Sequence, residues 1–274
     1  MLVCVIAGLL AGCLSRSGAL STIAPATHAA ATPGHSSGTV VTVLAHPAAQ
    51  PGCRYNRAVL AAHPLGYWPL QSGPPVTSAA RGGPAATLGG AGFLTFGAPG
   101  AGICVGDHAL LLGGGLTRTV SFDHSLGFAG RRRFSVEVWV RPTRIDRVYR
   151  SVFEHEQFSP RRSGWVLWVQ NRGASLELWN DGRIVAGVVV PVTRDSWNYL
   201  VFTWDTTAVR GYVDGVLRGA GPGSGAQLGA SRFPLYLGGD AHTQPFVGSL
   251  EAAAVYPYAL PAATVARHWA DRTG

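Results

Sequence analysis

The sequence has 274 residues, of which 47% are hydrophobic and 13% are charged. A chain of this length and apolar content can bury one large core or two small ones, which excludes a wholly disordered protein. The 37 glycines, 18 prolines and low charge are typical of short strands joined by tight turns, and they exclude a helical bundle or a coiled coil. The net charge of +8 comes from arginine alone, because the sequence contains no lysine.

The N-terminus has the pattern of an export signal. Residues 2–14 form an apolar run, which is shorter than the roughly 20 residues that a membrane-spanning helix needs. The run includes Leu10-Ala11-Gly12-Cys13, which resembles the bacterial lipobox, where the cysteine is lipidated after cleavage. We therefore expect residues 1–13 to be a signal peptide with Cys13 as the lipidation site, or else a plain secretion signal. Both predict an exported protein, anchored at the cell surface through a lipid or secreted.

The next segment, residues 14–52, consists mostly of Ala, Ser, Thr, Pro, Gly and His. Such a segment buries too little apolar area to fold, so it predicts a disordered linker. His28, His35 and His46 are irregularly spaced and have no Cys or acidic partner, which favours solvated side chains over metal ligands.

Two cysteines, Cys53 and Cys104, remain beyond the signal. In an exported protein such a pair predicts a disulfide bond, and no Cys-x-x-Cys spacing favours a metal site instead.

Residues 53–274 are predicted to form one all-β domain. A short helix is expected at Tyr55–His63, ended by Pro64, and another at Pro261–Arg272. The pair Asp214-Gly215 between apolar arms predicts a β-hairpin. Other strands are predicted at Phe134–Pro142, Gly164–Arg172, Ser175–Gly182, Gly187–Val192, Trp197–Asp205, Pro234–Asp240 and Gly248–Leu260. The absence of alternating strands and helices indicates a two-sheet antiparallel sandwich or jelly roll.

The segment Phe134–Pro142 alternates between two faces. One face carries Phe134, Val136, Val138 and Val140. The other carries Ser135, Glu137, Trp139 and Arg141.

Several motifs occur in a familiar order: YNRAVLAAHPLGYWPL, FSVEVWVRP, WNYLVFTWD, GYVDGVL, YLGG and GSLEAAAVYPYAL. In this order they resemble laminin-G-like domains of the concanavalin A-like lectin/glucanase superfamily, over residues 55–272. The resemblance implies a jelly roll of two curved antiparallel sheets, whose concave face and rim loops commonly bind sugars, sometimes beside Ca²⁺.

Glucanases of that superfamily carry the string E-x-D-x-x-E on one strand, and this sequence lacks it. The nearest approach is Glu154-His155-Glu156, where a strand would place the two carboxylates about 7 Å apart on one face. Arginines lie close in sequence, so we expect Glu154 and Glu156 to be paired with them rather than catalytic. No other catalytic motif occurs, and the sequence predicts no enzyme; a glycoside hydrolase using these two glutamates is the remaining alternative.

Sugar sites combine flat aromatic rings with planar polar side chains. Trp165 and Trp168 point to opposite faces of one strand, so at most one of them lines a platform with Trp179. We take Trp165, Trp179, Asn180 and Asp181 as candidate ligand-binding residues, with a turn-forming role as the alternative for Asp181.

Asp240 and His242 follow the YLGG motif, where a rim loop is expected. Asp240 is therefore the candidate ligand for a hydroxyl group or for Ca²⁺. No Asp-rich loop supplies the several oxygen ligands that Ca²⁺ needs, so no cofactor and no metal site are predicted.

Nine of the 22 arginines lie between residues 131 and 162. One interpretation is a patch for an anionic partner, such as an acidic polysaccharide, a phosphate-rich wall polymer or lipid headgroups. The alternative is a solvated loop. The candidate patch residues are Arg131, Arg132, Arg133, Arg147, Arg150, Arg161 and Arg162.

These features predict a non-catalytic binding module for carbohydrate at the cell surface. A protein–protein interaction or adhesion module that uses the arginine-rich rim is the first alternative. Nucleic acid is not expected as a partner, since no recognition helix or RNA-binding strand motif is present.

Overall fold

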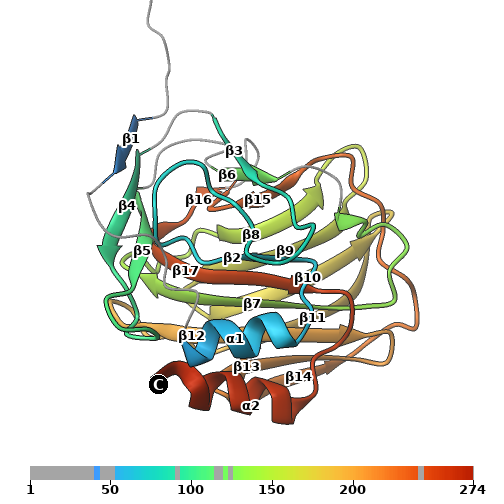
Figure 1. Ribbon diagram of the computed structural model, residues 1–274. Coiled ribbons are helices and arrows are strands. Elements are labelled where there is room, and N and C mark those ends of the chain that lie inside the picture. The colour runs from blue at the N-terminus through green and yellow to red at the C-terminus, as the bar shows by residue number, and fades with distance from the viewer. Residues whose placement is uncertain are drawn as a thin grey trace, which may run out of the picture. The chain divides into compact units, whose positions relative to one another are not determined.

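The computed structural model describes residues 40–43, 53–89, 93–113, 120–122, 126–239 and 244–273. These residues form two β-sheets packed face to face, with two short helices on the outside of one sheet (Figure 1). The all-β jelly-roll sandwich predicted from the sequence is confirmed.

Within the described residues, nine strands form the first sheet, and the short β2 (Gly66–Trp68) joins it by pairing with β17. The other strands, in spatial order, are β1 (Val40–Val43), β4 (Phe93–Pro99), β5 (His108–Gly113), β17 (Val247–Tyr256), β7 (Arg133–Pro142), β12 (Asn198–Asp205), β13 (Ala208–Val213) and β14 (Val216–Pro222).

The described part of the second sheet has eight strands, and β16 (Gln244–Pro245) joins it by pairing with β8. The other strands, in spatial order, are β11 (Arg183–Val190), β10 (Gly173–Asn180), β9 (Ser163–Gln170), β8 (Arg150–Gln157), β15 (Leu235–Leu237), β6 (Val120–Phe122) and β3 (Ala86–Leu88).

Strand β7 shows how the sequence pattern produces the sandwich. Phe134, Val136, Val138 and Val140 all belong to the core cluster between the sheets, as their period of two predicts. β7 lies between β12 and β17 near the middle of its sheet. The burial of this apolar face therefore fixes the register of the central strands.

The predicted hairpin joins β13 to β14. Asp214 and Gly215 have φ values of 54° and 77°, the pair of positive angles that a tight hairpin turn requires. A Cβ at Gly215 would lie 2.8 Å from the Cβ of Trp269, so only glycine allows the C-terminal helix to pack on this turn.

Large aromatic side chains fill the space between the sheets. Trp68, Phe122, Phe153, Trp165 and Trp204 are all almost completely buried in one cluster. Full burial of an aromatic side chain stabilises the folded state by roughly 1.5–3 kcal/mol, so these five side chains together make a large contribution to stability.

The two helices cover the outer face of the first sheet (Figure 1). They are α1 (Arg54–Ala61) and α2 (Ala262–Ala270), and a short 3-10 helix at Asp271–Thr273 follows α2. Because of this cover, Glu137 and Trp139 on the second face of β7 are buried too. The first sheet is thus enclosed on both faces over its central strands.

The predicted disulfide is present between Cys53 and Cys104. Cys53 is also the N-cap of α1, where its Sγ accepts a hydrogen bond from the backbone N–H of Asn56. The disulfide bond thus connects the start of α1 to the loop between β4 and β5.

The prediction of a linker over residues 14–52 is wrong for Val40–Val43. These residues form β1, which pairs in parallel with Phe93–Phe96 of β4. Three valines and a threonine have high strand propensity, and the edge of β4 offers them unpaired backbone groups. The other residues of the predicted linker and signal, including Cys13, lie outside the described residues.

Candidate functional site

The candidate site lies on the face of the second sheet that points away from the core. On β9 Trp165 belongs to the core, so the alternation of the strand places Trp168 on the outer face. On β10 Leu178 belongs to the core, which places its neighbours Glu177 and Trp179 on the outer face. Two indole rings and a carboxylate are thereby brought together on adjacent strands.

A hollow of about 610 Å³ lies over these residues, and we call it the aromatic hollow. Its walls come from the loop before β8, the β8–β9 turn and β16. The lining residues are Val148, Tyr149, Phe158, Arg162, Trp168, Glu177, Trp179 and Gln244.

Two rings of the aromatic hollow are open to solvent. Tyr149 is 47% exposed and Phe158 is 57% exposed. The Tyr149 ring meets the Trp168 ring edge to face, with 5.5 Å between centroids, which holds Tyr149 at the wall. Exposed aromatic surface in a recess is typical of an interaction site.

Arg162 lies among the polar groups of the hollow and is neutralised there. Its Nε donates a hydrogen bond to Oε1 of Glu156, and its Nη1 lies 3.3 Å from Oε2 of Glu177. The side chain of Glu156 is only 3% exposed. A buried carboxylate needs such a partner, so the position of Arg162 is fixed by Glu156.

The same guanidinium packs on aromatic rings. Its Cζ lies 4.1 Å from the ring centroid of Trp179 and 5.6 Å from those of Phe158 and Trp168. These distances are within the range of cation–π attraction. Arg162 therefore covers the inner rings, while Tyr149 and Phe158 stay open at the wall.

The prediction that Trp165 lines the site is wrong. Trp165 is fully buried, with its ring centroid 5.4 Å from that of Phe134 and 5.5 Å from that of Phe153. The sequence required one of Trp165 and Trp168 to lie in the core. Trp165 does so, and Trp168 lines the aromatic hollow with Trp179. Both faces of β9 are apolar, so the pattern did not indicate which face lies inside.

Asn180 and Asp181 lie where β10 turns into β11, beside the hollow but outside its lining. Asp181 has a φ of 49°, so it shapes the turn, and its Oδ2 lies 2.6 Å from Nη1 of Arg161. Asn180 donates from Nδ2 to the carbonyl of Gln227 at 3.1 Å. Of the predicted ligand residues, Trp179 alone lines the hollow among those that the structure describes.

Asp240 and His242, the predicted rim ligands, lie outside the described residues. Their role in binding a hydroxyl group or Ca²⁺ stays a prediction.

The seven arginines of the predicted anionic patch do not form one patch. Three form ion pairs within the domain, namely Arg150, Arg161 and Arg162. Three line a separate hollow at the start of β7, namely Arg131, Arg132 and Arg133. Arg147 is exposed in the loop before β8. A strand of ten residues spans about 30 Å, so arginines that flank β7 in sequence lie at opposite ends of it.

Glu154 and Glu156 are both buried, with exposed fractions of 1% and 4%. They share the outer face of β8, and Glu156 is paired with Arg162 as the sequence predicts. Hydrolysis of a glycosidic bond needs two carboxyl groups that reach the substrate. Both carboxyl groups are buried, and that of Glu156 forms an ion pair with Arg162.

A buried polar cluster lies between the first sheet and the helices, and the sequence analysis missed its role. The carboxylate of Glu137 accepts hydrogen bonds from the hydroxyls of Tyr55, Tyr199 and Tyr256 at 2.7, 2.9 and 2.6 Å. Nδ1 of His268 lies 3.1 Å from Oε2. Tyr55 comes from α1 and His268 from α2, so the cluster fastens both helices to the sheet.

Burial alone would raise the pKa of Glu137. The charge of His268 and the hydrogen bonds from His268, Tyr256 and Tyr55 outweigh it, and the pKa lies below its ordinary value. A charged carboxylate can only accept, so Nδ1 of His268 is the donor. The cluster is closed to solvent and is a structural element rather than a ligand site.

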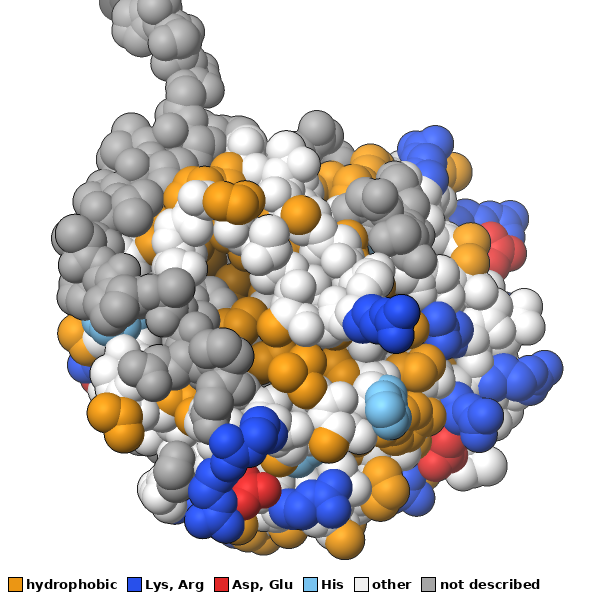
Figure 2. All heavy atoms as spheres, in the orientation of Figure 1, with side chains coloured by type: hydrophobic (Ala, Val, Ile, Leu, Met, Phe, Trp, Pro, Cys, Tyr) orange, Lys and Arg blue, Asp and Glu red, His pale blue; other side chains and the backbone are white. Residues whose placement is uncertain are grey.

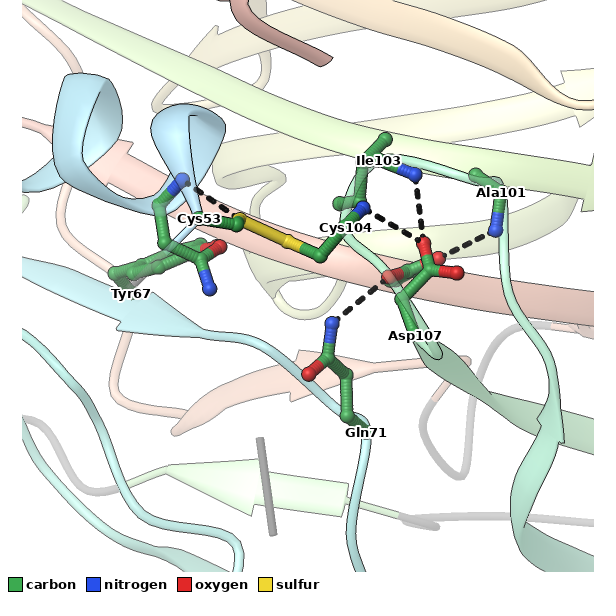
Figure 3. The surroundings of a disulfide bond; sticks show 9 residues. Cys53, Tyr67, Gln71, Ala101, Ile103, Cys104 and Asp107 are labelled. Atoms are coloured by element: carbon green, nitrogen blue, oxygen red, sulfur yellow. Dashed lines mark hydrogen bonds between the residues drawn. A yellow bond between two sulfur atoms is a disulfide. The ribbon is translucent and has the colours of Figure 1, made fainter. Parts of the chain in front are cut away.

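A second buried carboxyl group is that of Glu251, whose partners Ala101 and Gln71 lie near the disulfide bond in Figure 3. It accepts hydrogen bonds from the backbone N–H of Ala101 at 2.8 Å and from Nε2 of Gln71 at 3.1 Å. Burial and the charge of Asp107 raise its pKa well above the ordinary value. Asp107 in turn accepts a hydrogen bond from the backbone N–H of Ile103 at 2.7 Å.

In the described part of the chain, no three His, Cys, Asp or Glu side chains gather closely enough to hold a metal ion. None of the described helices has the length and hydropathy of a membrane span.

A smaller, mainly apolar hollow of about 180 Å³ opens on the face that carries α1 (Figure 2). It lies between α1 and residues 69–79. Its aromatic side chain, Tyr67, is 0% exposed and offers no surface for stacking. The aromatic hollow is therefore the stronger candidate for a ligand.

Comparison with known families matches residues 113–266 to the model of the concanavalin A-like lectin/glucanases superfamily. The match spans more than half of the chain. The chain belongs to this superfamily. No curated protein matches it in sequence.

Solved structures share the fold at low sequence identity. The binding domain of Paraclostridial Mosquitocidal Protein 1 is 12% identical, with a TM-score of 0.57, over 77% of this chain and 52% of that one. The Botulinum neurotoxin serotype G binding domain is 12% identical, with a TM-score of 0.56, over 75% and 50%. The present chain thus spans about half the length of those toxin domains.

A third match covers nearly the whole of a single domain. Domain 4 of AbnA, a GH43 extracellular arabinanase from Geobacillus stearothermophilus, was solved in complex with arabinotriose. It is 19% identical, with a TM-score of 0.51, over 76% of this chain and 98% of that one. At these identities the likeness establishes the fold alone.

Proposed function

We propose that this chain is an exported, non-catalytic domain that binds a glycan in the aromatic hollow. The observation that carries the proposal is the pair of exposed rings, Tyr149 and Phe158, at the wall of a recess floored by Trp168 and Trp179. Sugar rings present C–H faces that pack on such aromatic surfaces. Their hydroxyls need planar polar partners, and Glu177 lies in the same lining.

The fold supports a binding role by analogy. Domain 4 of AbnA, whose structure contains arabinotriose, has the same fold and a similar domain length. A fold hosts many functions, so the proposal rests on the hollow and not on this likeness.

Export is supported by the apolar N-terminal run and by the disulfide bond, since such bonds persist in oxidising compartments. In this proposal residues 1–13 are the signal with Cys13 as the lipid attachment site, and residues 14–52, apart from the strand Val40–Val43, are the linker. The membrane is then a partner through the lipid anchor only. Secretion without an anchor is the alternative.

The absence of catalysis is proposed from the state of Glu154 and Glu156. Both are buried, and Arg162 holds Glu156. A hydrolase would need both groups open to the substrate.

The proposal is tested by measuring binding of the purified chain to a panel of neutral and acidic glycans, with and without Ca²⁺. The double variant Tyr149→Ala/Phe158→Ala should weaken binding by about tenfold or more, because it removes both open rings. The matched control is Ile184→Ala/Leu217→Ala, which removes two apolar side chains that are 55% and 50% exposed elsewhere.

Equal affinity of the ring variant and the control variant would place the ligand elsewhere. Absence of binding to every glycan would overturn the proposal and favour a surface or extracellular protein as the partner. Release of reducing sugar that Glu156→Gln abolishes would favour the hydrolase.

A further inference from the structure

A second hollow lies where β7 begins and β12 ends, and we call it the arginine hollow. Its volume is about 600 Å³. Figure 2 shows basic side chains gathered along the right-hand border of the face that carries α1. The hollow is lined by Arg131, Arg132, Arg133, Asp205, Thr206 and Pro257.

The three arginines of this hollow are not among those that pair with a carboxylate in the described part of the chain. Arginines with a carboxylate within 4 Å include Arg54, Arg144, Arg150, Arg161, Arg162, Arg194 and Arg210. Arg131, Arg132 and Arg133 are adjacent in sequence, line one recess, and are not in that set. Three positive charges are therefore concentrated without an ion pair.

Arg131 is held in place by neutral groups. Its Nε donates to the carbonyl of Gly127 at 2.7 Å, its Nη2 donates to the carbonyl of Leu126 at 3.0 Å, and its Cζ lies 5.9 Å from the ring centroid of Phe128. The side chain is half-buried, and burial lowers its pKa. A fixed and partly desolvated cation without a counter-charge is typical of a prepared anion site.

The one acidic residue in the lining, Asp205, does not neutralise the three arginines. It accepts hydrogen bonds from the backbone N–H groups of Thr207 and Ala208, both at 2.9 Å, and from Nη1 of Arg210 at 3.1 Å. Burial opposes its ionisation, but the hydrogen bond from the Thr207 hydroxyl, together with these bonds, outweighs burial and lowers the pKa of Asp205 to about 2. Its charge is already balanced by Arg210 on its own hairpin.

Leu228 and Gly229 connect Arg131 of the arginine hollow with Trp179 of the aromatic hollow. On one side, the N–H of Leu228 donates to the carbonyl of Arg131 at 2.8 Å. On the other side, the N–H of Gly229 donates to the carbonyl of Trp179 at 3.0 Å. Two neighbouring residues thus join the backbones of Arg131 and Trp179, one lining residue of each hollow.

We propose that the arginine hollow binds an anionic group, a carboxylate or a sulfate, on the polysaccharide whose sugar ring occupies the aromatic hollow. The inference rests on the proposed function, because it assigns the charge to the same ligand. Guanidinium groups match the two oxygens of such anions through paired hydrogen bonds. The ligand class is therefore an acidic polysaccharide rather than a neutral one.

The test compares matched polysaccharides that differ in charge: polygalacturonate with its methyl ester, and dextran sulfate with dextran. We expect the full chain to bind the charged member of a pair more tightly. The double variant Arg132→Gln/Arg133→Gln should reduce affinity for the charged member about fivefold and leave the neutral member unchanged. Both side chains are exposed, so the fold should tolerate the change.

The control variant Arg172→Gln/Arg218→Gln removes the same charge from exposed positions on the β9–β10 turn and on β14. Equal losses in both double variants would indicate a general effect of net charge and overturn the inference. A chain that binds neutral and charged members alike would also overturn it, while the proposed function would stand. Loss of binding to both the charged and the neutral polysaccharide in Tyr149→Ala/Phe158→Ala would support the aromatic hollow as the sugar site, and it would leave the assignment of the charge to the arginine comparison.

The last measurement is sedimentation of the chain with vesicles of phosphatidylglycerol and phosphatidylcholine. Sedimentation with anionic vesicles, lost in Arg132→Gln/Arg133→Gln and without binding to any charged polysaccharide, would assign the hollow to a membrane surface instead. That result would contradict the inference as stated.

Discussion

The guanidinium carbon of Arg162 lies 4.1 Å from the ring centre of Trp179, so one face of the indole is covered by a residue of the same chain. A sugar that stacked on that face would have to displace Arg162, which forms an ion pair with the buried carboxylate of Glu156. At the wall, the Arg162 guanidinium is farther from Phe158, at 5.6 Å from its ring centroid, and Phe158 and Tyr149 remain 57% and 47% exposed. If a glycan binds as proposed, its ring would stack first on Tyr149 and Phe158, and Arg162 would be a polar partner inside the hollow.

Replacement of Arg162 tests the Arg162–Glu156 ion pair through its effect on the free energy of unfolding. Arg162→Met leaves the carboxylate of Glu156 buried without its cation, and we expect a loss of about 2–3 kcal/mol in the free energy of unfolding, since Arg162 itself is partly exposed. Glu156→Gln/Arg162→Met removes both charges and should recover most of that loss. Urea unfolding at pH 7 measures both values. A double variant no more stable than the single variant would show that the ion pair is not the cause.

The Glu137 cluster predicts an acid limit to stability. Because the pKa of Glu137 is lowered in the folded protein, its contribution is complete above the unfolded pKa of about 4.3 and is lost as the pH falls through the folded value. Glu137→Gln should reduce the free energy of unfolding by about 2–3 kcal/mol at pH 7, because it removes the charged acceptor of three hydroxyls and His268.

The measurement is the free energy of unfolding of both proteins between pH 7 and pH 2. The difference between them should shrink as the pH falls below 4. Glu177→Gln, at a partly exposed carboxylate, is the control for the loss of one negative charge. A constant difference at all pH values would contradict the assignment.

Much of the fold was predictable because strands reveal their buried face through alternation. The β7 pattern placed Phe134 and Val136 in the core, and the pair Asp214-Gly215 specified its hairpin turn. Both signals are local, so they need no knowledge of the partner strands. The strand Val40–Val43 was missed because its pairing with β4 depends on an edge that becomes available only in the assembled sheet.

The candidate site was harder to predict because its decisive features are not local. Trp165 and Trp168 lie on a strand with two apolar faces, and the packing of the second sheet alone decides which one is core. Glu137 looks like a solvent-facing residue in its strand, yet helices from both ends of the domain cover it. Tyr149 and Phe158 carry no motif, and their exposure is visible only in the folded chain.

Glu251 predicts the opposite dependence on pH. Burial and the charge of Asp107 raise its pKa, so the folded protein binds this proton more tightly than the unfolded chain does. The resulting stability is complete below the unfolded pKa of about 4.3 and is lost as the pH rises through the folded value.

Glu251→Gln removes that ionisation and keeps an acceptor oxygen and a donor group. We therefore expect the free energy of unfolding of the variant to change less than that of the unchanged protein between pH 5 and pH 9. The melting temperature across this range measures the effect, with Glu177→Gln again as the control. Parallel profiles of the two proteins across this range would show that Glu251 is charged in the folded state.

The disulfide bond predicts a large effect of reduction. Cys53 and Cys104 are 51 residues apart, and in the chain-entropy model a closed loop of this length stabilises the folded state by about 4 kcal/mol. Cys53→Ser/Cys104→Ser should lose most of that amount, measured by urea unfolding. Dithiothreitol should lower the midpoint of the unchanged protein and leave the variant unaffected. Because Cys53 also caps α1, the serine variant keeps a capping oxygen, and a loss much larger than 4 kcal/mol would mean that the bond also holds α1 on the sheet.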